Sequence, residues 1–175
     1  ETEPTPCYIE ELIAAHTAAT TSCDCTIGVI ASVGKYMPDP DATTDCIDCA
    51  GGKYIDVVGS DEEADCKNCI AGKWSSSEGR DEAEDCKDCA KGKFVEAEGS
   101  IASSDCIDCT AGKYVDVTGS TAGSACKDCA AGKSSAAAAV ACTDCTAGKS
   151  SAAAASICTE CAAGTYSGTN AVSPC

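Results

Sequence analysis

The chain has 175 residues and a formal net charge of −16, from 28 Asp and Glu against 12 Lys and Arg. Nucleic-acid-binding proteins carry the opposite charge, so this excess excludes a phosphate-binding surface as the main function, and it disfavours binding to anionic lipid. With 18 Cys but one Trp, one Phe and one Met, the composition excludes a conventional apolar core and predicts a disulfide scaffold.

The N-terminal segment is predicted to hold the one α-helix of the chain, over residues 6–20. Four of its side chains are spaced to share one helix face. These are Ile9, Leu12, Ile13 and His16. We expect this face to pack on the first repeat and cap the array, because the ends of arrays need covering. Docking on a neighbouring subunit is the alternative.

A twenty-residue repeat organises the chain from Cys46 onward. Each copy contains Cys-x-x-Cys, a Gly-Lys-aromatic triplet, a short alternating run such as residues 114–118, and a turn glycine. A fixed period predicts an array in which each unit contacts mainly its neighbours. Alternation followed by glycine predicts a small hairpin, and two strands alone need a disulfide to hold them.

The predicted fold is therefore a small disulfide-rich repeat protein: an elongated rod of short irregular β-hairpin units with one N-terminal α-helix. Its parts are a lead-in with a helical cap, a divergent first repeat, four 20-residue repeats, two 16-residue repeats and a final repeat. They span residues 1–24, 25–48, 49–128, 129–160 and 161–175. The 16-residue repeats lack the aromatic residue and the turn glycine, and their alanine runs are too short between cysteines to favour helix over a turn.

Seven Cys-x-x-Cys pairs are compatible with either zinc sites or disulfides. Four-cysteine zinc sites use pairs two at a time, so seven pairs leave one over. If the second cysteine of each pair bonds to the first of the next, no cysteine is left unpaired. The bonds are then Cys7–Cys23, Cys25–Cys46, Cys49–Cys66, Cys69–Cys86, Cys89–Cys106, Cys109–Cys126, Cys129–Cys142, Cys145–Cys158 and Cys161–Cys175. We favour this ladder and predict no metal and no cofactor.

The repeat resembles the one-disulfide modules of ephrin-receptor-type cysteine-rich repeats and is similar to the first module of tumour necrosis factor receptor domains. The likeness covers residues 46–175 and rests on Cys-x-x-Gly-Lys/Thr-Tyr followed by a short hairpin and a closing cysteine. It implies the ladder connectivity and an extended rod in which the aromatic residue packs on the disulfide. The chain lacks the two-disulfide module that alternates with the simple one in those receptors. By resemblance, uninterrupted arrays of the simple unit are more typical of large extracellular surface proteins of protists and algae.

Aromatic residues recur in register along the repeats. They are Tyr36, Tyr54, Trp74, Phe94, Tyr114 and Tyr166. We predict that they form the minimal core of each unit against its disulfide, because buried aromatic rings contribute most of the apolar area in small domains. A carbohydrate-binding stripe is the alternative.

Charged residues also recur. The lysines are Lys35, Lys53, Lys73, Lys93, Lys113, Lys133 and Lys149, and the acidic series is Asp45, Asp65, Asp85 and Asp105. We expect solvated ion pairs between units, each contributing little stability. The alternative is that the two series interlock on neighbouring rods.

Two further kinds of ligand are considered. Clustered carboxylates at Asp39, Asp41, Asp45 and Asp48 are candidate calcium ligands, but no twelve-residue calcium-binding loop accompanies them. The chain has no Asn-x-Ser/Thr sequon, whereas its Ser, Thr and Pro residues leave room for O-linked sugars.

Dense disulfides persist in oxidising compartments, which predicts an extracellular or cell-surface location. No apolar run is long enough to span a membrane, so no direct membrane insertion of this segment is expected. We expect a signal peptide to have been removed before Glu1, and more repeats or a tail to follow Cys175.

No set of nucleophile, base and orienting residue is recognisable, so the chain is not expected to be an enzyme. The predicted function is that of an extracellular structural protein, a protomer of a filament, appendage or surface layer, which associates with copies of itself head-to-tail or laterally. The alternative is a ligand-binding or spacer ectodomain of a cell-surface receptor or adhesin.

Overall fold

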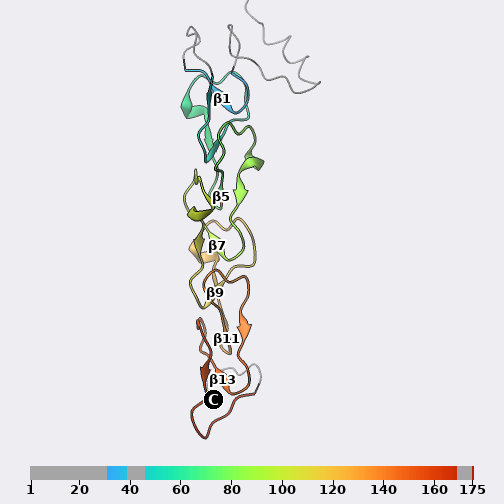
Figure 1. The fold of residues 1–175 in the computed structure, drawn as a ribbon, viewed down its shortest axis with the longest axis vertical. Coiled ribbons are helices and arrows are strands. Elements are labelled where there is room, and N and C mark those ends of the chain that lie inside the picture. The colour runs from blue at the N-terminus through green and yellow to red at the C-terminus, as the bar shows by residue number, and fades with distance from the viewer. Residues whose placement is uncertain (1–30, 39–45, 169–174) are drawn as a thin grey trace, which may run out of the picture. The chain divides into compact units, whose positions relative to one another are not determined.

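The computed structural model describes residues 31–38, 46–168 and 175 (Figure 1). These residues fall into two compact units: one contains 31–38, 46–67 and 77–85, and the other contains 68–76, 86–168 and 175. The predicted N-terminal helix lies outside the described residues, together with its face of Ile9, Leu12, Ile13 and His16.

Regular structure in the described residues consists of two-residue strands and four short 3-10 helices, with no α-helix among them. The strands are β1 (Lys35–Tyr36), β2 (Ile47–Asp48), β3 (Lys53–Tyr54), β4 (Lys67–Asn68), β5 (Lys73–Trp74), β6 (Lys87–Asp88), β7 (Lys93–Phe94), β8 (Ile107–Asp108), β9 (Lys113–Tyr114), β10 (Lys127–Asp128), β11 (Lys133–Ser134), β12 (Thr143–Asp144), β13 (Lys149–Ser150) and β14 (Thr159–Glu160). The 3-10 helices are η1 (Glu63–Asp65), η2 (Ala83–Asp85), η3 (Ser103–Asp105) and η4 (Gly123–Ala125). Consecutive strands pair into seven two-stranded sheets.

Each strand pair places the lysine of a Gly-Lys dipeptide and the residue after it opposite the two residues between the next two cysteines. In β9 and β10, Lys113 is opposite Asp128 and Tyr114 is opposite Lys127. Directly opposed side chains in an antiparallel pair are close enough to interact, so this register brings Lys113 and Asp128 together. Figure 1 shows β5, β7, β9, β11 and β13 of the second unit following one another in chain order.

A disulfide closes each hairpin. Cys109 and Cys126, which precede β9 and β10, are bonded with their Cα atoms 5.7 Å apart. Hairpins this short are not stable alone in water, so covalent closure is needed to hold the strands together. We call the residues from one half-cystine to its partner a module. The seven modules are 49–66, 69–86, 89–106, 109–126, 129–142, 145–158 and 161–175.

The strands are shorter than the alternating residues predict. Alternation over residues 114–118 indicates a strand, but β9 ends at Tyr114. Val115 is 1% exposed, whereas Val117 is 56% exposed. A period of two specifies a longer strand only where a whole sheet face is buried, and module 109–126 buries only Val115 of this run against its disulfide.

The glycine of each Gly-Lys-aromatic triplet occupies a tight turn. The Lys113 amide donates to the Thr110 carbonyl at 3.1 Å, and Gly112 between them has φ +87°. A positive φ at the third turn position is that of a type II turn, which favours glycine. The Gly112 carbonyl then accepts from the Cys129 amide at 2.9 Å, so this turn fixes the start of the next module.

Neighbouring modules are joined by the same backbone hydrogen bonds each time. The amide of a mid-module turn glycine donates to the carbonyl of the first half-cystine in the preceding module. The Gly99 amide donates in this way to Cys69, and the Gly119 amide to Cys89. The Val95 amide donates to the Ser120 carbonyl of the following module at 3.1 Å. Contacts that run from neighbour to neighbour are those of a tandem repeat array.

In the two short modules, alanine occupies the position of the turn glycine. The amides of Ala138 and Ala154 donate to the carbonyls of Cys109 and Cys129 at 2.9 and 2.8 Å. Their φ angles are +57° and +58°, and no other described non-glycine residue has a positive φ. The alanine runs therefore form turns, as expected, but two alanines adopt a conformation that disfavours a side chain.

Replacing Ala138 with Gly is expected to stabilise module 129–142 by about 1 kcal/mol, because glycine adopts a positive φ without steric strain. Hydrogen exchange of the Val115 amide, which donates to the Ala139 carbonyl, measures the local free energy of opening. The control is Ala136→Gly, at a position without a positive φ, which should destabilise the module by about 0.5–1 kcal/mol. Stabilisation by both variants, or by neither, would contradict this explanation.

The divergent first repeat uses Ala31 where later repeats have a half-cystine. The Gly59 amide donates to the Ala31 carbonyl at 2.8 Å, as the Gly79 amide does to Cys49. Ala31 is 1% exposed, and it precedes Gly34 by the same number of residues as Cys49 precedes Gly52. The sequence pattern assigns this place to Cys25, which lies outside the described residues.

Candidate functional site

The disulfide ladder is the repeated chemical feature of the described residues. The bonded pairs are Cys49–Cys66, Cys69–Cys86, Cys89–Cys106, Cys109–Cys126, Cys129–Cys142, Cys145–Cys158 and Cys161–Cys175. The first six result from joining the second cysteine of each Cys-x-x-Cys to the first of the next, and the seventh joins Cys161 to the single Cys175. Cys46 is also disulfide-bonded, whereas the predicted partners Cys7, Cys23 and Cys25 lie outside the described residues. Disulfides at this density indicate an oxidising environment.

In three of the four long modules the disulfide is covered by an aliphatic side chain of its own module and by an aromatic ring that precedes the module. Cys109 and Cys126 pack with Val115 of their own module and with Phe94 of the preceding one. Cys89 and Cys106 pack in the same way with Val95 and Trp74. These small clusters replace a continuous core. Trp74 and Phe94 are thus structural, as the core interpretation predicts, whereas that prediction is wrong for Tyr166, which is 89% exposed.

Lysine side chains lie against three aromatic rings, one of which is Trp74. The Nζ atoms of Lys67, Lys87 and Lys127 are 5.9, 5.3 and 5.8 Å from the ring centroids of Tyr54, Trp74 and Tyr114. A cation at this distance is attracted by the ring quadrupole. A carbohydrate would have to displace these lysines to stack on the rings, which disfavours a sugar-binding stripe.

The recurring lysines pair within the chain, with an acidic series different from the expected one. Lys73 lies 2.8 Å from Asp88, Lys113 lies 2.5 Å from Asp128, and Lys93 is paired with Asp108. The partners come from the two residues between adjacent cysteines, because strand pairing sets them directly opposite the lysines. All are partly exposed, so each pair contributes little stability.

The expected acidic partners have other roles. Asp105 accepts hydrogen bonds from the amides of Ile101 and Ala102, both at 2.9 Å, which satisfies free amides at the start of η3. Asp85 lies 3.5 Å from Arg80. Asp45 lies outside the described residues. Interlocking of the lysine and aspartate series between neighbouring rods would therefore have to compete with pairs already formed inside one chain.

The Asp88 carboxylate interacts with two side chains, those of Lys73 and Thr118. The hydrogen bond from Lys73 holds the pKa of Asp88 below its ordinary value. The positive charge of Lys73 and a hydrogen bond from Thr118 lower this pKa further, whereas desolvation opposes the shift. Thr118 belongs to module 109–126, and its Oγ1 lies 3.3 Å from Asp88 Oδ2.

Replacing Lys73 with Met is expected to raise the pKa of the Asp88 carboxyl toward about 3.9, its unperturbed value. A lowered pKa in the folded state means that the ionised form stabilises the fold above the unfolded pKa, and that this contribution is lost as pH falls through the folded pKa. An NMR titration of the Asp88 carboxyl in both proteins measures the shift. An unchanged pKa would show that Lys73 is not its cause.

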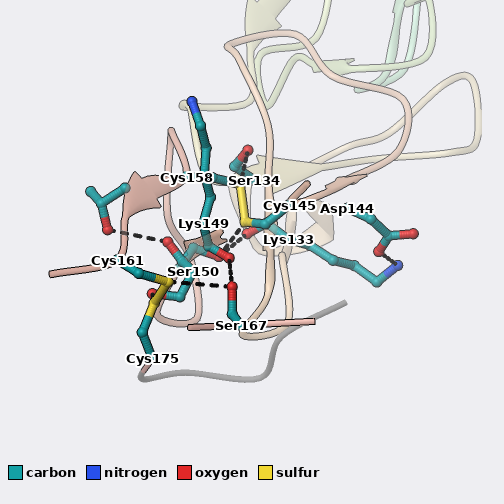
Figure 2. The surroundings of a disulfide bond; sticks show 12 residues. Lys133, Ser134, Asp144, Cys145, Lys149, Ser150, Cys158, Cys161, Ser167 and Cys175 are labelled. Carbon is teal, nitrogen blue, oxygen red and sulfur yellow. Dashed lines mark hydrogen bonds and ion pairs between the residues drawn. A yellow bond between two sulfur atoms is a disulfide. The ribbon is translucent and has the colours of Figure 1, made fainter. Parts of the chain in front are cut away.

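The short modules surround their disulfides with hydroxyl groups. Ser134, at the position of an aromatic residue, has its Oγ 3.3 Å from Cys158 Sγ. Ser151, at the position of a buried aliphatic residue, donates to the Lys133 carbonyl at 2.9 Å and has its Oγ 3.4 Å from Cys145 Sγ. Figure 2 shows the same arrangement one module on, where Ser167 reaches both Cys161 and the Lys149 carbonyl.

Candidate calcium ligands are not brought together in the part of the chain that is described. Asp39, Asp41 and Asp45 lie outside it, and Asp48 is paired with Lys35 at 2.7 Å. Among the described residues, no three His, Cys, Asp or Glu side chains are grouped so that they could hold a metal ion. Within the same residues, no helix has the length and apolarity that crossing a membrane requires.

No protein-family model matches the chain, and no curated protein matches it. What the structure establishes is a tandem series of β-hairpins, each stapled by a disulfide.

Proposed function

We propose that this chain is an extracellular structural protein, the protomer of a filament, appendage or surface layer. The observation that carries the proposal is that the recurring side chains make contacts within the scaffold itself. Phe94 and Trp74 cover disulfides, while Lys73 and Lys113 pair with aspartates of their own hairpins. A repeat whose side chains and turns serve mainly to join one module to the next is suited to building length.

The proposed form is an extended rod that associates with further copies of itself. Repeat arrays grow by adding equivalent units, and a heterologous contact that does not close generates a fibre. The predicted helical face of Ile9, Leu12, Ile13 and His16 is our candidate for an end contact. Exposed Ser and Thr side chains are candidate sites for O-linked sugars on the rod surface.

Negative-stain microscopy of the purified native chain tests this function, with a sample reduced by dithiothreitol beside it. We expect long regular fibres that fall apart on reduction, because opened modules lose the geometry of the contacts. Single short particles that never associate would contradict the proposal and favour a receptor or adhesin ectodomain. Fibres that survive complete reduction would show that the ladder does not maintain the assembly.

One variant and its control test whether the predicted end contact contributes to fibre formation. Leu12→Glu places a charge on the expected apolar face and should shorten or abolish the fibres, whereas Glu11→Gln beside it should leave them unchanged. If both variants form normal fibres, the copies associate through another surface.

A further inference from the structure

We infer that the disulfide of module 145–158 is a thiol-exchange site, at which a low-molecular-weight thiol opens the array while the disulfides of the long modules stay closed. This inference concerns the chemistry of single disulfides and does not depend on the proposed assembly. It comes from the contrast between the two kinds of module within one chain.

The first difference is access to sulfur. In the long modules both half-cystines are buried: Cys109 is 0% exposed and Cys126 is 7% exposed. In module 145–158 the first half-cystine is buried, with Cys145 2% exposed, but Cys158 is partly exposed. Thiol–disulfide exchange requires that a thiolate reach one sulfur along the S–S axis, so exposure of one partner is sufficient.

The second difference is the cover over the disulfide. Phe94 and Val115 shield the Cys109–Cys126 disulfide, and the equivalent positions beside Cys145–Cys158 hold Ser134 and Ser151. Replacing two apolar side chains with hydroxyl groups removes most of the barrier to an incoming thiol. Figure 2 shows Ser134 beside the sulfur of Cys158.

The Ser134 hydroxyl also suits the chemistry of the exchange. A thiolate attacks Cys158 Sγ and forms a mixed disulfide, the Cys145–Cys158 bond breaks, and its electron pair leaves on Cys145 as a thiolate. A second thiol then attacks the mixed disulfide, releasing the Cys158 thiolate and an oxidised thiol dimer. Ser134, 3.3 Å from Cys158 Sγ, is placed to donate to the Cys158 thiolate, whereas the Ser151 hydroxyl, 3.4 Å from Cys145 Sγ, donates its proton to the Lys133 carbonyl. Hydrogen bonds to a charged form favour it.

Opening this disulfide would affect its neighbours through the backbone. The Ala154 amide of module 145–158 donates to the Cys129 carbonyl, and the Ala154 carbonyl lies against Gly112 two modules back. A reduced module 145–158 would therefore loosen contacts that reach module 109–126. Exposed disulfides of this kind are the labile ones in proteins.

The test is to expose the native chain to graded reduced glutathione, block free thiols with an alkylating reagent, and locate the label by peptide mass spectrometry. Cys145 and Cys158 are expected to be labelled at a rate about tenfold or more above that of Cys109 and Cys126, as exposed and shielded disulfides differ in access. Equal rates, or faster opening of the long modules, would overturn the inference.

A variant that carries the long-module residues tests whether the side chains over the disulfide, and not another difference between the modules, control the rate of exchange. Ser134→Phe with Ser151→Val should slow labelling of Cys145 and Cys158 toward the rate of Cys109 and Cys126. The reciprocal pair, Phe94→Ser with Val115→Ser, should accelerate labelling of Cys109 and Cys126. If the first variant does not fold, the reciprocal variant and the comparison within the native chain still decide. Unchanged rates in the reciprocal variant would show that side-chain cover does not control exchange.

Discussion

Gly112→Ala is expected to destabilise the array by about 3 kcal/mol, the sum of strain at positive φ and overlap with a neighbouring backbone. Gly112 has φ +87°, and a Cβ atom there would overlap the carbonyl of Ala154, two modules further along. Because a backbone carbonyl cannot rotate away as a side chain can, the modules would have to separate. The loss should appear as about a hundredfold lower exchange protection of the Cys129 amide, which donates to Gly112.

Gly148→Ala provides the matched control. Gly148 has φ +79°, and its added Cβ would have nothing within 4 Å. Only the strain of positive φ remains, so the expected loss is about 1–2 kcal/mol, read from the amide of Cys161 that donates to Gly148. Equal losses at the two positions would show that the close approach between modules does not contribute to stability.

Removing one disulfide from a long module is expected to cost about 3 kcal/mol. In Cys89→Ser with Cys106→Ser, a disulfide spanning a sequence separation of 17 is lost, and the chain-entropy model gives this value for a loop of similar size. The substitution also exposes the cluster of Val95 and Trp74. Trp74 is the one tryptophan of the chain, so its emission should shift to longer wavelength as the ring becomes solvated.

The control for this effect is Cys161→Ser with Cys175→Ser, in the last module. In a repeat array a local change is transmitted mainly to adjacent units, so Trp74 emission should keep its native wavelength in this variant. A red shift in both variants would indicate that the modules unfold as one cooperative body. No shift in either would show that the disulfide does not hold Trp74 in place.

The cysteine spacing was sufficient to predict that hairpins recur and to predict the seven disulfides of the described residues. Covalent pairing at a fixed period leaves few alternatives once the second cysteine of each pair bonds forward, as Cys109 does to Cys126. The mid-module turn glycines were also predicted, and Gly99 and Gly119 have the positive φ that favours this residue.

The strand register could not be predicted from the same pattern. Alternation at residues 114–118 indicated a longer strand, but local alternation does not reveal whether a second side chain will find something to pack on. Val115 is buried against its disulfide, whereas Val117 remains exposed. The register in turn decides that Lys113 faces Asp128, so the ion-pair partners of the lysines were missed with it.

Substitutions that preserve the backbone were the hardest to detect. Ala31 replaces a half-cystine, and Ala138 replaces a turn glycine, without any change in the hydrogen bond that the position makes. Neither residue type signals its role. Aligning the 16-residue repeats on the alanine turn instead of on their cysteines alone would have identified Ala138 and Ala154 as turn positions.

Hydrogen exchange of the native and the fully reduced chain tests most directly whether disulfides replace an apolar core in this fold. We predict that the amides linking modules, such as Gly119 to Cys89 and Val95 to Ser120, are protected in the native chain and lose that protection throughout when all disulfides are reduced. Protection that persists at these amides in the reduced chain would contradict this view, because the clusters of Val115 and Phe94 and the backbone hydrogen bonds would then be sufficient to hold the modules.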